Sequence, residues 1–443
     1  MRKRMYIFII IVIMIFFSGC DKFSLPEEMI QKPNMDKKIT VAQEVIDELL
    51  STYEIILPRS IENSAAINYA DLTGDGNDEL IAIYKVKDKL NEYMIGILKE
   101  YMGTWEKLDF IDGVALDIQD IIFKDIDNDG KEDIIIKWLE ENKKLRVEVY
   151  SEKNRNMFPR FKKECDDVEI IDLDNDNIDD FVLFNITEDG EVMATLYNVE
   201  NIESQEINSI IIPSDGNVRS FLANSGKASK DINGIFVDVP IGIYSGYTEL
   251  LIKRDGKLMK VFSKDENNFG ITVSIYSTND ADVDKDGIRE INILYQEELF
   301  DEKSNNTNAD IQKWYNWDGY RGLTPKVDIH FDSLNGFRFY IPEEWQDNYI
   351  MEVNEDRDKK YMFIYEKENY PVKKIEIARL LVIDDKGLDN FNQKANEAGR
   401  KYSIIGKNDG KTFLFYNNKN DSRIRKELKV DDKIIKDNFE ILR

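Results

Sequence analysis

The chain has 443 residues, more than one ordinary domain needs, and 42% of them are hydrophobic, which is enough to bury a core. Its formal net charge is -26 and its isoelectric point is near 4.6. These values argue against nucleic acid as a partner and against docking on acidic membrane by a basic patch, and they favour cations such as calcium.

The N-terminal residues have the pattern of a targeting segment. Three basic residues, Arg2 to Arg4, precede an apolar run from Met5 to Phe17, which is short for a membrane span and typical of a signal sequence. The following Ser18-Gly19-Cys20 resembles the lipobox of bacterial lipoproteins. That resemblance implies a signal peptide over residues 1–19, lipidation of Cys20, and an anchored protein on the extracytoplasmic face of the bacterial cell membrane. The alternative is an uncleaved membrane anchor.

Residues 20–39 are polar, contain two prolines and lack a periodic pattern, which predicts a tether. Val41, Val45 and Leu49 then recur at helical spacing and predict a short helix over residues 40–52.

Four similar acidic stretches follow along the chain. They begin at Asp71, Asp125, Asp172 and Asp282, so the intervals are 54, 47 and 110 residues. Because the last interval is about double, we expect a degenerate copy between them, and "KDINGIFVDV" at Lys230 lies in that gap. A repeat of about 50 residues is typical of propellers and arrays.

The segments between the acidic stretches have the composition of β-strands. "EYMIGILKEYMGTWEKLDFI" predicts a hairpin that turns at Met102-Gly103, and "YTELLIKRDGKLMKVFS" predicts another that turns at Asp255-Gly256. Each repeat therefore offers about four short strands, which is the content of one propeller blade.

Each acidic stretch is numbered from its first aspartate, and positions one, three, five and nine carry oxygen-bearing side chains. Glycine, or Asn177 in the third stretch, stands at position six and suits a left-handed turn. With a backbone carbonyl at position seven, these groups offer six or seven oxygens, which suits calcium better than magnesium. The predicted ligands are Asp71, Thr73, Asp75, Asn77 and Glu79; Asp125, Asp127, Asp129, Lys131 and Asp133; Asp172, Asp174, Asp176, Ile178 and Asp180; and Asp282, Asp284, Asp286, Ile288 and Glu290. The alternative is a set of acidic β-turns without metal.

An EF-hand would need an acid at position twelve and flanking helices. Position twelve is apolar in all four stretches, and the flanking segments, such as "DIIIKW" and "EINILY", are strand-like. The stretches resemble instead the FG-GAP, or VCBS-type, repeats of integrin-α-like proteins, in which an aspartate-rich hairpin loop binds calcium between two strands of a blade. The resemblance implies a mainly β protein with a calcium-binding β-propeller of about five to seven blades over residues 40–329.

An aromatic segment, "IQKWYNWDGYRG", ends the repeat region. Trp314, Tyr315, Trp317 and Tyr320 would form a sugar-stacking or protein-binding patch if they were exposed. We favour a hairpin that turns at Asp318-Gly319 and places aromatic side chains in the core.

Residues 330–443 lack the acidic stretch and predict a small α+β domain. "KKIEIARLLVID" and "KTFLFYN" predict strands, apolar residues from Leu388 to Tyr402 predict a helix, and "DDKIIKDNFEIL" predicts a closing helix and strand. The segment resembles the small domains of the PsbP and Mog1 type, which implies a binding or docking module.

The chain offers few residues for catalysis. It has one histidine, His330, which we place in a strand at the domain junction, and it has no nucleophile elbow, phosphate loop, zinc spacing or dinucleotide fingerprint. We therefore expect a non-enzymatic surface lipoprotein that binds a protein or glycan of the envelope or host. The alternative is an envelope polysaccharide hydrolase or lyase that uses the propeller as a scaffold and two carboxylates outside the acidic stretches.

Overall fold

The computed structural model describes residues 53–60, 62–199, 205–242, 245–263, 269–274, 280–293, 311–346, 348–354, 359–367 and 373–442. The predicted signal peptide, Cys20, the tether and the helix over residues 40–52 lie outside these residues. Internal contacts divide the chain into two compact units, of which the second comprises Pro58–Asn63, Leu72–Gly74 and Ala115–Arg443. In the part of the chain that is described, no helix is long and apolar enough to cross a membrane.

The first unit contains one antiparallel sheet. Its strands are β1 (Tyr53–Ile55), β2 (Ile67–Ala70), β3 (Glu79–Val86), β4 (Glu92–Tyr101) and β5 (Thr104–Val114), and both β1 and β2 pair with β3. The predicted hairpin at Met102-Gly103 is confirmed, and both residues have the positive φ angles, 50° and 87°, that a tight turn requires.

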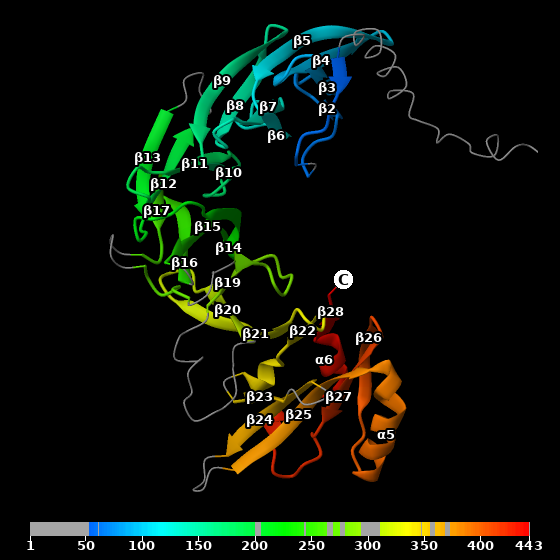
Figure 1. The fold of residues 1–443 in the computed structure, drawn as a ribbon. Helices are drawn as coiled ribbons and strands as arrows, with labels where there is room; N and C mark the ends of the chain where they lie inside the picture. Colours follow the sequence, from blue (N-terminus) through cyan, green and yellow to red (C-terminus); the bar gives the residue numbers. More distant parts are fainter. Residues whose placement is uncertain are drawn as a thin grey trace, which may run out of the picture. The chain divides into compact units, whose positions relative to one another are not determined.

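The second unit begins with three four-stranded antiparallel sheets, each built from consecutive strands (Figure 1). The strands are β6 (Asp117–Lys124), β7 (Asp133–Leu139), β8 (Leu145–Lys153) and β9 (Asn156–Cys165); β10 (Asp167–Ile171), β11 (Asp180–Ile186), β12 (Val192–Asn198) and β13 (Gln205–Ile212); and β14 (Leu222–Ser229), β15 (Ile232–Ile241), β16 (Ser245–Arg254) and β17 (Lys257–Lys260). The protein is thus mainly β, and its repeated four-stranded meanders are consistent with the blades of a β-propeller.

Successive sheets of the second unit share their cores. Phe161 of β9 packs on Phe181 of β11, with ring centroids 5.8 Å apart, inside one buried cluster. In the next cluster, Val182 and Phe184 of β11 pack with Val237 of β15. Apolar residues at alternate strand positions on both faces thus bury each sheet between its neighbours, which explains the nearly continuous apolar runs in β7 and β11.

A longer sheet follows, in the order β18 (Asp280–Ala281), β19 (Glu290–Asn292), β20 (Ile311–Trp317), β21 (Leu323–Asp332), β22 (Phe337–Tyr340) and β28 (Phe439–Ile441). The predicted hairpin at Asp318-Gly319 is confirmed between β20 and β21. Trp314 and Trp317 are both buried, but in separate clusters: Trp314 packs with Val283 and Ile329, and Trp317 packs with Phe236 and Ile291. Tyr320 in the turn is 69% exposed. Residue 330 lies within β21, so hydrogen bonding in this sheet continues across the sequence position at which we divided the chain.

The C-terminal residues form a second kind of sheet, in the order β23 (Ile350–Asn354), β24 (Lys359–Lys367), β25 (Lys373–Asp384), β27 (Lys411–Asn417) and β26 (Ser403–Asn408). The helices are η2 (Glu343–Trp345), η3 (Asp385–Gly387), α5 (Leu388–Glu397), η4 (Lys426–Leu428) and α6 (Asp432–Asp437). Leu388 and Phe391 of α5 pack on Leu381 and Leu414 of the sheet. The predicted strands and the closing helix and strand are confirmed. The predicted helix is confirmed from Leu388 but ends at Glu397, so Tyr402 lies outside it.

Candidate metal centres

The four acidic stretches occupy the same place in four sheets: each joins the first strand of a repeat to the second. We name residues 71–79, 125–133, 172–180 and 282–290 loops 1 to 4; they lie between β2 and β3, β6 and β7, β10 and β11, and β18 and β19. The degenerate copy at Lys230 lies at the equivalent place, where Lys230 and Asp231 form the two-residue turn between β14 and β15. The predicted repeat is therefore confirmed as a structural repeat.

Position six of each loop has the left-handed backbone that the sequence predicts. The φ angles are 80° at Gly76, 86° at Gly130, 68° at Asn177 and 88° at Gly287. This turn directs the N–H of position six to a carboxylate oxygen of position one, for example from Gly130 to Asp125 Oδ2 at 2.9 Å. The same bond recurs in loops 1, 3 and 4 at 2.8, 2.8 and 3.0 Å.

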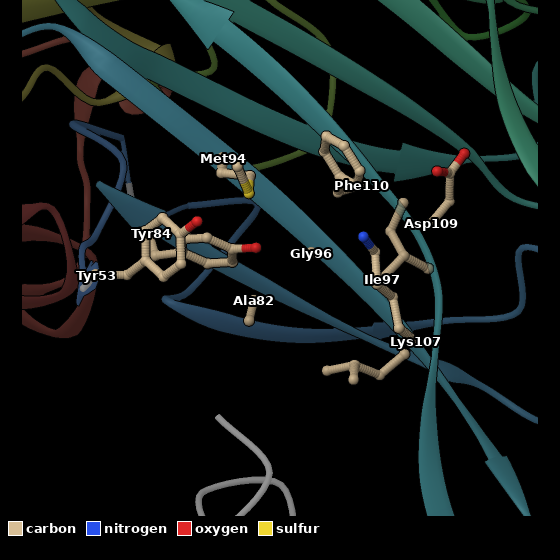
Figure 2. Close-up of a pocket in the computed structure, with 10 residues that line it drawn as sticks. Tyr53, Ala82, Tyr84, Met94, Gly96, Ile97, Lys107, Asp109 and Phe110 are labelled. Atoms are coloured by element: carbon tan, nitrogen blue, oxygen red, sulfur yellow. The ribbon is translucent and has the colours of Figure 1, made fainter. Parts of the chain in front are cut away.

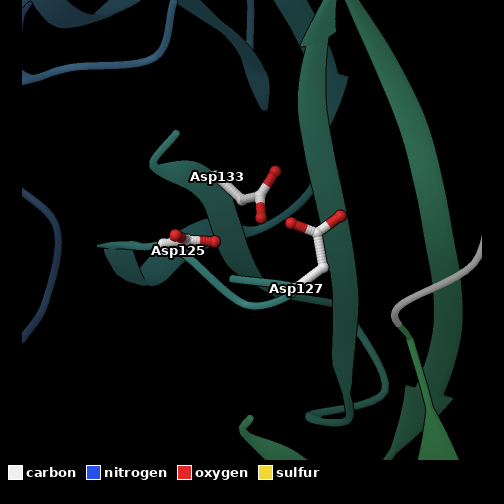
Figure 3. A group of neighbouring side chains, drawn as sticks. All are labelled: Asp125, Asp127 and Asp133. Carbon is white, nitrogen blue, oxygen red and sulfur yellow. The ribbon is translucent and has the colours of Figure 1, made fainter. Parts of the chain in front are cut away.

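In loops 2, 3 and 4 the acids at positions one, three and nine converge. Figure 3 shows the carboxylates of Asp125, Asp127 and Asp133 facing one another in loop 2. One oxygen from each lies within 4.8 Å of the others, as in the equivalent groups of loops 3 and 4. The members of those two groups are Asp172, Asp174 and Asp180, and Asp282, Asp284 and Glu290.

The acids at position five lie outside these three groups. Asp129, Asp176 and Asp286 each accept the N–H of position seven, at 2.9, 2.9 and 2.8 Å. Their roles as ligands, and those of the position-seven carbonyls, stay predictions.

The acid at position nine forms the buried floor of each group. In loop 4, Glu290 is 0% exposed, and its Oε2 accepts the N–H of Val283 at 2.9 Å. Among the residues that the structure describes, its buried Oε1 has no hydrogen-bond partner, and neither has the buried Oδ1 of Asp282. Burial, assisted by the charges of Asp284 and Asp286, raises the pKa of Glu290 to about 7. A buried carboxylate oxygen without a partner is costly, so this group calls for a cation.

Loops 2 and 3 also have a buried acid at position nine, but its oxygens accept hydrogen bonds from the protein. Asp133 is 3% exposed, and burial raises its pKa to about 6, although the Ser151 hydroxyl and the N–H of Ile126 donate to its oxygens. In loop 3, burial likewise raises the pKa of Asp180, which accepts the N–H of Leu173 at 3.1 Å.

Loop 1 differs in its charge and its contacts. Position three is Thr73, and the ammonium of Lys99 lies 2.8 Å from Asp75 Oδ2 and 2.6 Å from Glu79 Oε1. Lys99 and Glu79 are both buried, so their ion pair satisfies the floor of this loop without a metal. No local pattern predicts the role of Lys99, because it lies 20 residues beyond Glu79 on another strand.

The donor set of loops 2 to 4 suits calcium. The converging groups consist of carboxylate oxygens, the hard ligands that Ca²⁺ prefers, and loop 4 contains buried oxygens to which no described residue donates a hydrogen bond. A bound calcium ion would relieve the repulsion among these acids and fix the turn between two strands.

A separate hollow lies on one face of the sheet in the first unit (Figure 2). Its volume is about 240 Å³, and it is lined by Tyr53, Tyr84, Met94 and Phe110, with other residues of β3 to β5. The side chain of Tyr84 lies across Gly96, where a Cβ would be only 3.0 Å from the ring Cε1 and the hydroxyl oxygen. Burial raises the pKa of Tyr84 to about 12, so its hydroxyl stays protonated at neutral pH.

His330, the one histidine, is buried in β21 among aromatic rings. Its ring centroid lies 4.4 Å from that of Tyr361 and 5.4 Å from that of Phe337. These contacts place His330 in the core of the C-terminal region, and its predicted position in a strand is confirmed.

No family model matches the chain, and no curated protein matches its sequence. Among solved structures, the chain is similar to a Lactobacillus plantarum protein at 10% identity and a TM-score of 0.29, covering 72% of this chain and 86% of that one. The β-propeller domain of the Trilobed protease from Pyrococcus furiosus is 14% identical, with a TM-score of 0.30 and coverage of 73% and 98%. Saccharomyces cerevisiae Sqt1 is 8% identical, with a TM-score of 0.34 and coverage of 75% and 94%. Because these identities and TM-scores are low, the fold is defined by the strand pairing and not by these similarities.

Proposed function

We propose that the chain is a non-enzymatic, calcium-binding protein of the bacterial surface, built on an integrin-α-like β-propeller of about five to seven blades. The observation that carries the proposal is Glu290, a fully buried carboxylate with an unpartnered oxygen, which faces Asp282 and Asp284 in loop 4. The similar acidic groups in loops 2 and 3 support the same role for the repeat as a whole.

Calcium in these loops stabilises the fold. Each loop joins the first two strands of a sheet, and its first and ninth positions stand at the ends of those strands. An ion that binds both positions cross-links the two strands and neutralises carboxylates that otherwise repel one another. The affinity expected for such extracellular loops is about 10⁻⁴ to 10⁻³ M.

Calorimetric titration of the full chain, held in mild detergent, tests the metal. We expect calcium to bind and to raise the melting temperature relative to chelator, and Glu290→Gln to reduce both the stoichiometry and the thermal shift. Equal melting temperatures in millimolar calcium and in chelator, without binding heat, would refute the proposal.

The protein would be held at the membrane through Cys20 and would bind a protein or glycan of the envelope or host. The aromatic hollow of the first unit supports this part of the proposal, because partly exposed aromatic rings lined also by a lysine and an aspartate, Lys107 and Asp109, are typical of binding surfaces.

A capture experiment tests the binding function. The immobilised chain is exposed to envelope extract in calcium and in chelator, and we expect a partner to be retained in calcium. Shortening of polysaccharide in the extract, without any retained partner, would instead favour the alternative of a hydrolase or lyase.

A further inference from the structure

Every acidic loop has a basic side chain from another strand in contact with two of its acids. Lys99 of β4 contacts loop 1, Arg160 of β9 contacts loop 2, Lys253 of β16 contacts loop 3 and Lys326 of β21 contacts loop 4. Arg160 and Lys326 share one position, the bulge in the fourth strand of their sheet, whereas Lys99 lies on the third strand of its repeat. Lys253 comes from the following sheet, whereas the others come from the same sheet as their loop. A basic side chain thus reaches all four loops, from three different places in the fold.

The four contacts reach different depths in the loops. In loop 4, Lys326 Nζ lies 2.8 Å from Asp284 Oδ2 and 2.6 Å from Asp286 Oδ2, and the floor acid Glu290 keeps an unpartnered buried oxygen. Lys326 therefore holds one member of the converging group, Asp284, together with Asp286 outside it, and leaves Asp282 and Glu290 to another cation.

In loop 3, the lysine reaches the floor of the group. Lys253 Nζ lies 3.0 Å from Asp174 Oδ2 and 2.9 Å from Asp180 Oδ1, and both acids belong to the converging group. In loop 2, Arg160 Nη1 is close to one member, Asp127 Oδ2, at 2.6 Å and is 3.9 Å from Asp133 Oδ1.

We propose that these basic side chains are tethered counter-cations that compete with calcium for shared carboxylates and so rank the affinities of the loops. The inference rests on the proposed calcium-binding function. Loop 4, whose floor is not taken by its lysine, binds most tightly, and loop 3 binds more weakly because Lys253 holds two members of its group. Loop 1 is closed by Lys99 and does not take up calcium.

The physical reason is local charge. A calcium ion in loop 3 must either share Asp174 and Asp180 with an ammonium group 3 Å away or displace that group, and either course costs free energy. The cost is smaller in loop 4, where the lysine does not contact the floor acid. Removal of the tethered charge leaves calcium as the ion that neutralises the group. We expect an affinity gain of about tenfold for Lys253→Met, which corresponds to about 1.4 kcal/mol.

Calcium calorimetry on the full chain in detergent tests the inference. To isolate loop 3, the titrations use a background with Asp125→Asn and Asp282→Asn, which disable loops 2 and 4. In that background, Lys253→Met should tighten calcium binding about tenfold, and Lys253→Arg, which keeps the charge if the methionine variant fails to fold, should not tighten it.

A matched control separates contact from net charge. Lys124 forms an ion pair with Asp179 of the same loop at 2.6 Å, and Asp179 is not a member of the converging group. Lys124→Met should therefore change the affinity much less than Lys253→Met. In the otherwise native chain, Glu79→Gln in loop 1 should leave the calcium stoichiometry unchanged.

The outcomes distinguish this inference from the function on which it rests. If the native chain binds calcium but Lys253→Met binds no more tightly than Lys124→Met, the tethered-cation inference is wrong and the calcium function stands. A reduced stoichiometry in Glu79→Gln would likewise overturn the assignment of loop 1. If neither the native chain nor the lysine variants bind calcium, both proposals are overturned.

Discussion

Glu290→Gln should make the metal-free protein more stable, although it removes a predicted metal ligand. The carboxylate is fully buried, has one unpartnered oxygen and has a pKa of about 7, against 4.5 for an ordinary glutamate. Above pH 7, ionised Glu290 therefore lowers the free energy of unfolding by up to about 3 kcal/mol, since each pKa unit corresponds to about 1.4 kcal/mol. A neutral amide avoids this cost and can still accept the N–H of Val283.

Glu79→Gln, at position nine of loop 1, is the matched comparison. Glu79 is equally buried but accepts a hydrogen bond from Lys99 at 2.6 Å, so its replacement removes the buried member of the two carboxylates that pair with this ammonium and leaves Asp75 alone. Removing one partner of a buried ion pair is destabilising. The same substitution at equivalent positions should thus change the stability of the metal-free protein in opposite directions.

Thermal and urea unfolding at pH 8 in chelator, and again in millimolar calcium, measures both effects. We expect the melting temperature in chelator to rise by roughly 5 °C for Glu290→Gln and to fall for Glu79→Gln. Calcium should stabilise Glu290→Gln less than the native chain. If Glu290→Gln is destabilised in chelator as Glu79→Gln is, the reasoning from the unpartnered oxygen is refuted.

Three further predictions concern pH, the aromatic hollow and the membrane. Burial raises the pKa of Asp133 to about 6 from 3.8, so between these pH values the folded metal-free chain keeps a proton that the unfolded chain releases. The free energy of unfolding should therefore fall by up to about 3 kcal/mol as the pH rises from about 4 to 6. Asp133→Asn should reduce this pH dependence in urea titrations. Gly96→Val should fill part of the hollow and displace the Tyr84 ring, weakening any partner retained there in the capture experiment by at least tenfold while the far-ultraviolet circular dichroism is kept; unchanged capture would exclude this surface. Cys20→Ser should abolish incorporation of labelled fatty acid and release the chain from the membrane fraction, and persistent labelling would contradict lipidation at this residue.

The sequence predicted the features that depend on neighbouring residues. Asp255-Gly256 forms the expected hairpin turn because both residues adopt positive φ angles, and Asn177 replaces glycine at a left-handed position for the same reason. The repeat could be traced even at Lys230, where the acids are lost, because the strands keep their spacing although the loop has lost its ligands.

The sequence did not predict the features that depend on residues far apart in the chain. Arg160 reaches Asp127 across 33 positions, and Lys253 reaches loop 3 from the following sheet, so no local spacing marks either contact. Trp314 and Trp317, three residues apart, are buried in separate clusters, which the sequence of one strand does not reveal because it depends on what covers each face of the sheet. The electrostatics of the loops therefore follow from the tertiary fold, whereas their shape follows from the local sequence.

The pairing of β28 with β22 has a consequence for how the chain is made. The meanders β6–β9, β10–β13 and β14–β17 consist of consecutive strands, so each can fold soon after it leaves the ribosome. The edge of β22, by contrast, waits for Phe439, about 100 residues later. At a synthesis rate of about 5–20 residues per second, that edge stays unpaired for about 5–20 s. During this interval an apolar strand that contains Phe337 and Phe339 is open to pairing with other nascent chains, so chaperone capture during translation should concentrate on this segment.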